Sequence, residues 1–102
     1  MYAAVSEFTV AEADRQAFET SFAASMKDTL VGVPGLRRST LLRPAGRTTD
    51  RGYLAVMEFE DEAAYRTYVS SEAFHRSHSG PRESIASDFR AASFESVLEL
   101  TD

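Results

Sequence analysis

The 102-residue sequence has no cysteine, no tryptophan and only two histidines. The absence of cysteine excludes disulfides, thiol catalysis and cysteine-ligated metals. No apolar run approaches the roughly 20 residues of a membrane span, and no basic-then-hydrophobic leader opens the chain, so we expect a cytoplasmic protein without a membrane partner. The motifs of nucleotide-binding loops, nucleophile elbows and HExxH metal helices are also missing. Hydrolases and nucleotide-dependent enzymes are therefore unexpected.

Positive charge is scarce as well, because the formal net charge is −5. This balance disfavours nucleic acid as a partner. Five of the eleven basic residues nevertheless lie between Arg37 and Arg51. They form either an ordinary solvated strand and loop or a small cradle for a carboxylate or phosphate. The sequence leaves both interpretations open.

Hydrophobic periodicity divides the chain into strands and helices. Alternation of period two predicts strands at residues 2–10, 36–43, 53–59 and 92–100. The first helix is indicated by an apolar stripe that recurs at every fourth position and consists of Phe18, Phe22, Met26 and Leu30. Thr9 and Glu12 have the spacing of a capping box before it, and Gly32 lies where it should stop.

A second helix is expected to begin at the acidic residues 60–62, which suit the positive end of a helix dipole. A short helix should follow and reach His78 before the turn at Gly80 and Pro81. Residues 82–92 have the weakest pattern, in which Ile85 and Phe89 hint at one or two more helical turns.

The order βαββαβ predicts one domain over residues 1–102, with an α+β, ferredoxin-like sandwich in which both helices cover one face of an antiparallel sheet. Strands 2–10 and 53–59 are apolar on both faces. Because two helices can cover only one face, the other face is expected to pack against a second copy of the chain. The pattern therefore predicts a homodimer.

The candidate functional residues each have a structural and a functional interpretation. His78 follows Phe74 by four residues, so it is either a packing or helix-end residue or a ligand and acid–base group directed into a cavity. His75 is expected to face solvent, since a metal site shared with His78 lacks a third well-placed ligand. Tyr65 and Tyr68 are core aromatics or hydrogen-bond donors to a substrate.

The apolar candidates are Phe22, Met26 and Phe74, which are core residues by default and become cavity walls if a cavity exists. Ser6 stands between aromatic residues on the first strand. It marks either a tight contact or a hydrogen-bond donor in an apolar pocket.

Four segments in this order resemble the antibiotic-biosynthesis-monooxygenase family of dimeric α/β barrels. They are residues 32–35 (Gly-Val-Pro-Gly), residues 41–44 (Leu-Leu-Arg-Pro), residues 53–62 and residues 68–78. The resemblance implies two sheets packed face to face in a homodimer, with a hydrophobic cavity between sheet and helices in each subunit.

The segment around His78 is most similar to haem-degrading members of that family. The resemblance implies that His78 is the haem-iron ligand, that Tyr68 stands where those proteins have tryptophan, and that Ser6 stands where they have asparagine. Phe22, Met26, Tyr65 and Phe74 would then contact the ligand. The alternatives are a cofactor-independent oxygenase of a quinol or polyphenol, in which Tyr68 or His78 removes a proton, and a non-catalytic binding or stress-response barrel.

Overall fold

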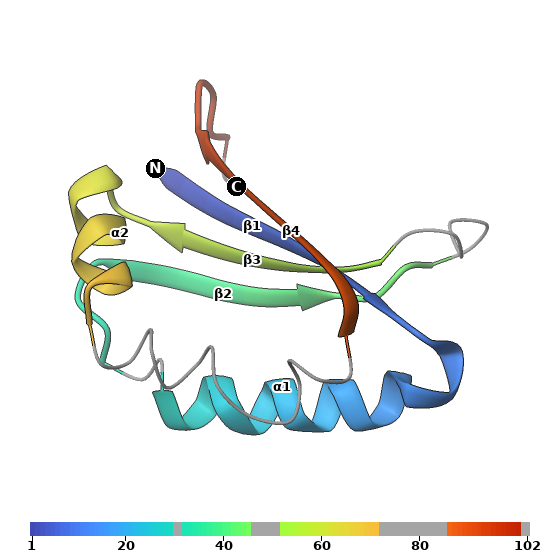
Figure 1. The fold of residues 1–102 in the computed structure, drawn as a ribbon. Coiled ribbons are helices and arrows are strands. Elements are labelled where there is room, and N and C mark those ends of the chain that lie inside the picture. The colour runs from blue at the N-terminus through green and yellow to red at the C-terminus, as the bar shows by residue number, and fades with distance from the viewer. Residues whose placement is uncertain (30–31, 46–51, 72–85, 101–102) are drawn as a thin grey trace.

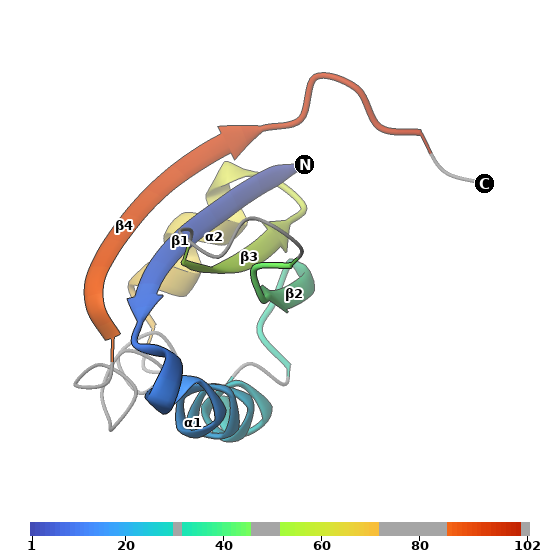
Figure 2. The ribbon, with the colours of Figure 1, turned by 90° about the vertical axis from the view of Figure 1, so that its right-hand side faces the viewer.

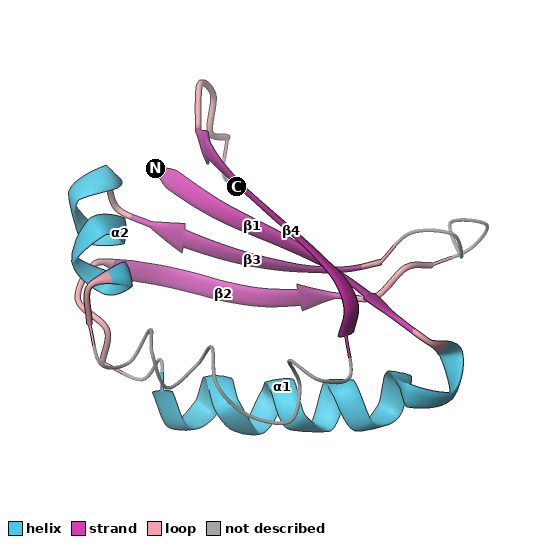
Figure 3. Ribbon diagram, in the orientation of Figure 1, coloured by secondary structure: helices cyan, strands magenta, loops and turns pink. Residues whose placement is uncertain are grey.

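The computed structural model describes residues 1–29, 32–45, 52–71 and 86–100, and for residues 28, 29 and 86–89 it describes the backbone alone. One antiparallel sheet and two α-helices make up the described fold (Figures 1 and 3). The elements in chain order are β1 (Tyr2–Val10), a 3-10 turn (Glu12–Asp14), α1 (Arg15–Thr29), β2 (Leu36–Leu42), β3 (Tyr53–Phe59), α2 (Glu62–Val69) and β4 (Ala86–Glu95). This is the ferredoxin-like α+β arrangement that the sequence predicted.

The strand order in the sheet is β2-β3-β1-β4, and every pair is antiparallel. Strand β1 is central, with Ser6 opposite Ala55 of β3 on one side and Ala91 of β4 on the other. This register matters for function because it brings small residues from three strands to one point on the sheet.

Both helices pack on the same face of the sheet, which is the concave face in Figure 2. Helix α1 contributes Phe18 and Phe22 to a buried cluster with Phe8, Val10, Tyr53 and Ala55 of β1 and β3. Helix α2 contributes Tyr68, which packs on Phe59 at the other end of β3. The aromatic stripe of α1 is therefore the core face that the period of four predicted.

The predicted capping box before α1 is wrong. Thr9 is still part of β1, and Ala11 precedes the 3-10 turn without a side-chain hydrogen bond to its amides. Pairing of Thr9 and Val10 with β4 keeps the chain extended here, so the local capping preference of Thr9 is overridden.

Helix α2 begins at a true side-chain cap. Asp61 has an extended backbone, and its carboxylate accepts a hydrogen bond from the Ala64 amide at 2.8 Å. The turn before β2 approaches this end closely, because a β-carbon added to Gly35 would lie 2.5 Å from the Ala64 β-carbon. Gly35 also has φ +77°, a conformation in which glycine is strongly preferred.

The last strand lies earlier in the chain than the sequence predicted. Strand β4 covers Ala86–Glu95 rather than residues 92–100, and the backbone at residues 86–92 is strand rather than helix. Its pairing with β1 ends where Glu95 faces Tyr2, at the beginning of β1. Within the described chain, no strand lies beside the apolar alternation that follows Glu95. Strand β1 does lie beside the residues before Ala92, although several of them are poor strand formers.

Candidate ligand cavity

A cavity of about 480 Å³ lies between the sheet and the two helices. The described residues that line it are Ala4, Val5, Ser6, Phe8, Phe22, Met26, Ala55, Met57, Tyr65, Tyr68, Ala91, Ala92 and Ser93. Its volume is within the range of ordinary small-molecule sites, about 300–1,000 Å³. The fold thus leaves room for a ligand where a filled core could have formed.

The floor of the cavity is hollow because small side chains meet there. Ser6 and Ala4 of β1 lie opposite Ala91 and Ser93 of β4, and Ser6 also lies opposite Ala55 of β3. Alternate residues of a strand share one face of a sheet, so these side chains face the helices together. Larger residues at these positions would fill the cavity.

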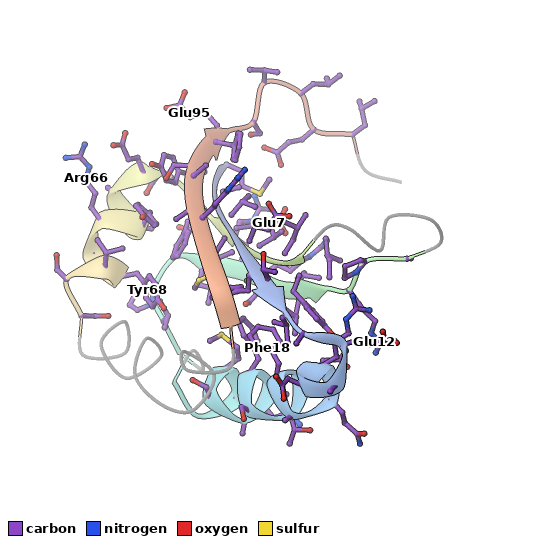
Figure 4. All side chains as sticks on the ribbon, turned by 45° about the vertical axis from the view of Figure 1, so that its right-hand side comes forward. Glu7, Glu12, Phe18, Arg66, Tyr68 and Glu95 are labelled. Atoms are coloured by element: carbon purple, nitrogen blue, oxygen red, sulfur yellow. The ribbon has the colours of Figure 1, made fainter. Side chains whose placement is uncertain are left out.

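Aromatic rings hold the α2 side of the cavity in place. The Tyr65 ring lies 5.1 Å from that of Tyr2 and 5.5 Å from that of Phe59, and the Tyr68 ring lies 5.6 Å from that of Phe59. Only 2% of Tyr68 is exposed. Figure 4 shows Tyr68 directed from α2 toward the interior, while Arg66 points away. These ring contacts give the wall a defined shape against which a flat ligand can pack.

The polar groups of the lining are hydroxyls. They come from Ser6, Ser93, Tyr65 and Tyr68, and the described lining includes no Asp, Glu, Lys, Arg or His. Such a surface can donate and accept hydrogen bonds to the oxygens of a neutral ligand, while most of the contact is apolar. No group of three or more potential metal ligands occurs among the described residues.

The structure brings together five of the seven residues that the sequence singled out. Ser6, Phe22, Met26, Tyr65 and Tyr68 all line this cavity. The other two, His78 and Phe74, lie outside the described residues, as does His75.

Sequence reasoning missed Ser93 and its neighbours on β4. The predicted strand placed its apolar alternation on Phe94 and the residues after it, and Phe94 is in fact 55% exposed. Ser93 reaches the cavity because it lies opposite Ala4. The register between the first and last strands would have located it, and no local pattern encodes that register.

A polar cluster fixes α1 against the sheet beside Phe18. The Glu19 carboxylate accepts hydrogen bonds from Arg43 Nε at 2.8 Å, Arg43 Nη2 at 2.9 Å and the Tyr53 hydroxyl at 2.5 Å. These bonds, from Arg43 first, lower the pKa of Glu19 below its usual value. Burial, with the bond to Glu19, raises the pKa of the Tyr53 phenol. The cluster connects α1 to β3 and to the end of β2.

The arginine-rich stretch does not form an anion cradle in its described part. Arg37, Arg38 and Arg43 each pair with a different carboxylate, of Glu99, Glu58 and Glu19 respectively. Arg47 and Arg51 lie outside the described residues. These three guanidinium groups are already neutralised by partners from the same chain, which agrees with the simpler interpretation of a solvated strand.

A family model described as antibiotic biosynthesis monooxygenase matches residues 1–80. The chain belongs to this family. No curated protein matches it by sequence. Among solved structures, MhuD of Mycobacterium tuberculosis, a haem degrader with two haems bound in its active site, is 20% identical, with a TM-score of 0.81 over 99% of this chain and 100% of that one.

Two further solved structures broaden the comparison. SnoaB of Streptomyces nogalater, a cofactor-independent oxygenase, is 25% identical with a TM-score of 0.76 over 99% of this chain and 97% of that one. A dabb family protein of Mesorhizobium loti with a ferredoxin-like fold is 21% identical with a TM-score of 0.73, covering 94% and 96% of the two chains. The fold of this chain is thus shared by a haem degrader and by a cofactor-independent oxygenase.

The residues of the cavity fit haem in character. Its described walls combine flat aromatic rings, aliphatic groups and the thioethers of Met26 and Met57. A macrocycle needs such an apolar enclosure, and tyrosine and methionine are among the side chains that ligate haem iron.

No helix of the described chain is long and apolar enough to cross a membrane.

Proposed function

We propose that this protein is a monooxygenase that encloses a flat hydrophobic ligand, with haem as the favoured ligand. The observation that carries the proposal is the cavity of about 480 Å³, whose described lining is aromatic, aliphatic and hydroxyl-bearing without a charged side chain. The likeness to the haem degrader MhuD in fold supports it. A bound haem would supply the iron at which dioxygen chemistry occurs.

Within this proposal the residues of the chain have distinct roles. If haem binds, His78 would ligate its iron, as the family resemblance implies. Tyr65, Tyr68, Phe22, Met26 and Phe74 are the contact residues, and the ring contacts of Tyr65 and Tyr68 with Phe59 keep two of them in place. The Ser6 hydroxyl donates a hydrogen bond to a ligand oxygen from the floor of the cavity. The apolar lining limits the access of water to the reacting atoms.

Titration of the purified protein with hemin tests this function. We expect a saturable Soret band that differs from free hemin and that His78→Ala removes. His75→Ala is the matched control and should leave the band unchanged, because His75 is predicted to face solvent. If the wild-type protein produces no shifted band, haem binding is refuted. A band that survives in His78→Ala but not in His75→Ala would assign the ligand to His75.

The second candidate is a cofactor-independent oxygenase that acts on a quinol or polyphenol. The observation in its favour is the set of four hydroxyl groups around an otherwise apolar cavity, which matches a flat substrate with several oxygens. SnoaB, a cofactor-independent oxygenase with the same fold, supports it. In this case Tyr68 or His78 takes a proton from the substrate.

Oxygen uptake with a panel of hydroquinones, in the presence of a metal chelator and without hemin, separates the candidates. Uptake that Tyr68→Phe or His78→Ala reduces would favour the cofactor-independent enzyme over the haem protein. A protein that neither binds hemin nor consumes oxygen would be the third alternative, a binding or stress-response barrel.

We further propose that residues 1–102 act as one domain within a homodimer. The helices leave the convex face of the sheet uncovered, and the segment after β4 extends away from the body of the molecule (Figure 2). Val97, Leu98 and Leu100 in this segment are 99%, 74% and 84% exposed. Exposed apolar surface of this kind is usual where a partner packs. Light scattering after size exclusion should give twice the monomer mass of 11.3 kDa; a monomer would refute the dimer.

Location in the cytoplasm stays a prediction of the sequence.

A further inference from the structure

A second hollow lies beside the cavity, toward the edge strand β2. It is a groove of about 300 Å³ between α1 and β2, lined by Phe22, Ala23, Met26, Lys27, Ser39 and Leu41. Phe22 and Met26 also line the main cavity. The two hollows therefore meet at these two side chains.

The shared wall consists of one fixed and one adaptable side chain. Phe22 is 5% exposed, and its ring is 6.2 Å from that of Phe8 and 5.8 Å from that of Phe18. Met26 is half-buried and unbranched, and methionine changes its rotamer at little cost to fit irregular space. A rotation of Met26 could thus connect the hollows without disturbing the aromatic core.

The groove differs from the cavity in carrying a cation. Lys27 lines it, together with the hydroxyl of Ser39 from β2. Arg38 of β2 and Arg43 just after it pair with Glu58 and Glu19, whereas Lys27 forms no ion pair with any residue that the structure describes. An ammonium group and a hydroxyl beside an apolar surface suit a carboxylate on an apolar arm.

We propose that the groove binds a carboxylate-bearing arm of the flat ligand held in the main cavity. The Lys27 ammonium binds the carboxylate, Ser39 donates a hydrogen bond to it, and Met26 moves to let the arm pass. This inference rests on the proposed function, and it assigns to Lys27 the anion-binding role that the arginines of residues 37–43 do not have. It also defines the ligand class as a flat apolar ring system with an acidic side arm.

Parallel titrations with hemin and with hemin dimethyl ester, whose carboxylates are masked, test the proposal. The wild-type protein should bind hemin about tenfold more tightly, a difference of about 1.4 kcal/mol. Lys27→Glu should remove this preference and leave the affinity for the ester unchanged. Ser39→Asp, on the opposite wall, should have the same effect by repulsion. Added salt should also narrow the preference, because the groove is open to solvent.

Arg38→Glu is the matched control. It reverses the charge of the residue next to Ser39 on β2, and this arginine already has Glu58 as its partner. It should keep the preference for hemin. If wild type, Lys27→Glu and Ser39→Asp all bind hemin and the ester equally well, haem binding stands and the groove proposal is refuted. If neither compound binds to the wild-type protein, the proposed function itself is refuted, and the groove proposal with it.

Discussion

Removal of the Glu19 carboxylate should destabilise the protein mainly through one buried hydroxyl. Glu19→Ala breaks the two hydrogen bonds from Arg43 and the one from Tyr53. The Arg43 side chain is 65% exposed, so that ion pair should contribute only about 0.2–1 kcal/mol. Tyr53 is 1% exposed, and a buried hydroxyl without its acceptor costs about 1–3 kcal/mol. Together these two contributions give an expected loss of about 1–4 kcal/mol.

Urea unfolding followed by far-UV circular dichroism measures this loss. Arg43→Ala should cost less than about 1 kcal/mol. The double variant Glu19→Ala/Tyr53→Phe should be more stable than Glu19→Ala alone, because it also removes the donor that was left unpaired. Equal losses in Arg43→Ala and Glu19→Ala, or a double variant no more stable than Glu19→Ala, would refute this reasoning.

The same cluster predicts how stability responds to acid. The bond from Arg43 holds the pKa of Glu19 below its usual value, so the stabilisation is complete above the unfolded pKa of about 4.3 and is lost as the pH falls through the folded pKa. The difference in stability between wild type and Glu19→Ala should therefore be full at pH 7 and shrink below about pH 4. A difference that stays constant down to pH 2 would contradict this assignment.

Two further predictions concern the start of helix α2. Gly35→Ala should lower the free energy of unfolding by about 2–4 kcal/mol, because it combines a left-handed backbone with a clash against Ala64. Gly32→Ala is the control: its φ is also positive, at +82°, but the space around it is open, so it should cost only about 1–2 kcal/mol. Similar losses of stability in the two variants, measured by denaturant titration, would show that the clash is unimportant. Asp61→Ala should cost about 0.5–2 kcal/mol by removing the cap, and Asp61→Asn should restore most of it; an Asn variant as unstable as the Ala variant in the same assay would disprove the capping role.

Most of the fold could be predicted because its signals are local. The alternation in β1 and β3 and the period of four in α1 each occur within one element, and burial on one face produces them directly. Five residues that line the cavity were predicted in the same way, since Phe22, Met26, Tyr65 and Tyr68 belong to helical stripes and Ser6 is a polar residue between aromatic residues on one strand face.

The errors have a common cause, which is pairing between distant segments. Thr9 has the preference of a helix cap but lies in a strand, and residues 96–100 alternate like a strand but have none beside them. In both cases pairing with β1 decides, because its ladder runs through Val10 and ends where Tyr2 faces Glu95. A ladder hydrogen bond depends on what lies opposite, which a local pattern does not contain.

The sequence by itself therefore determined the types of most elements, the apolar faces of β1, β3 and α1, and the family, because each depends on residues close together in the chain. Tertiary structure alone decided that Ser6 and Ser93 share a hollow floor, and that Glu19 binds both Tyr53 of β3 and Arg43, the residue after β2. It alone placed Met26 between a neutral cavity and a groove that carries Lys27. These features arise where residues 12 to 87 positions apart meet, and only the register of the sheet and the packing of α1 on it bring them together.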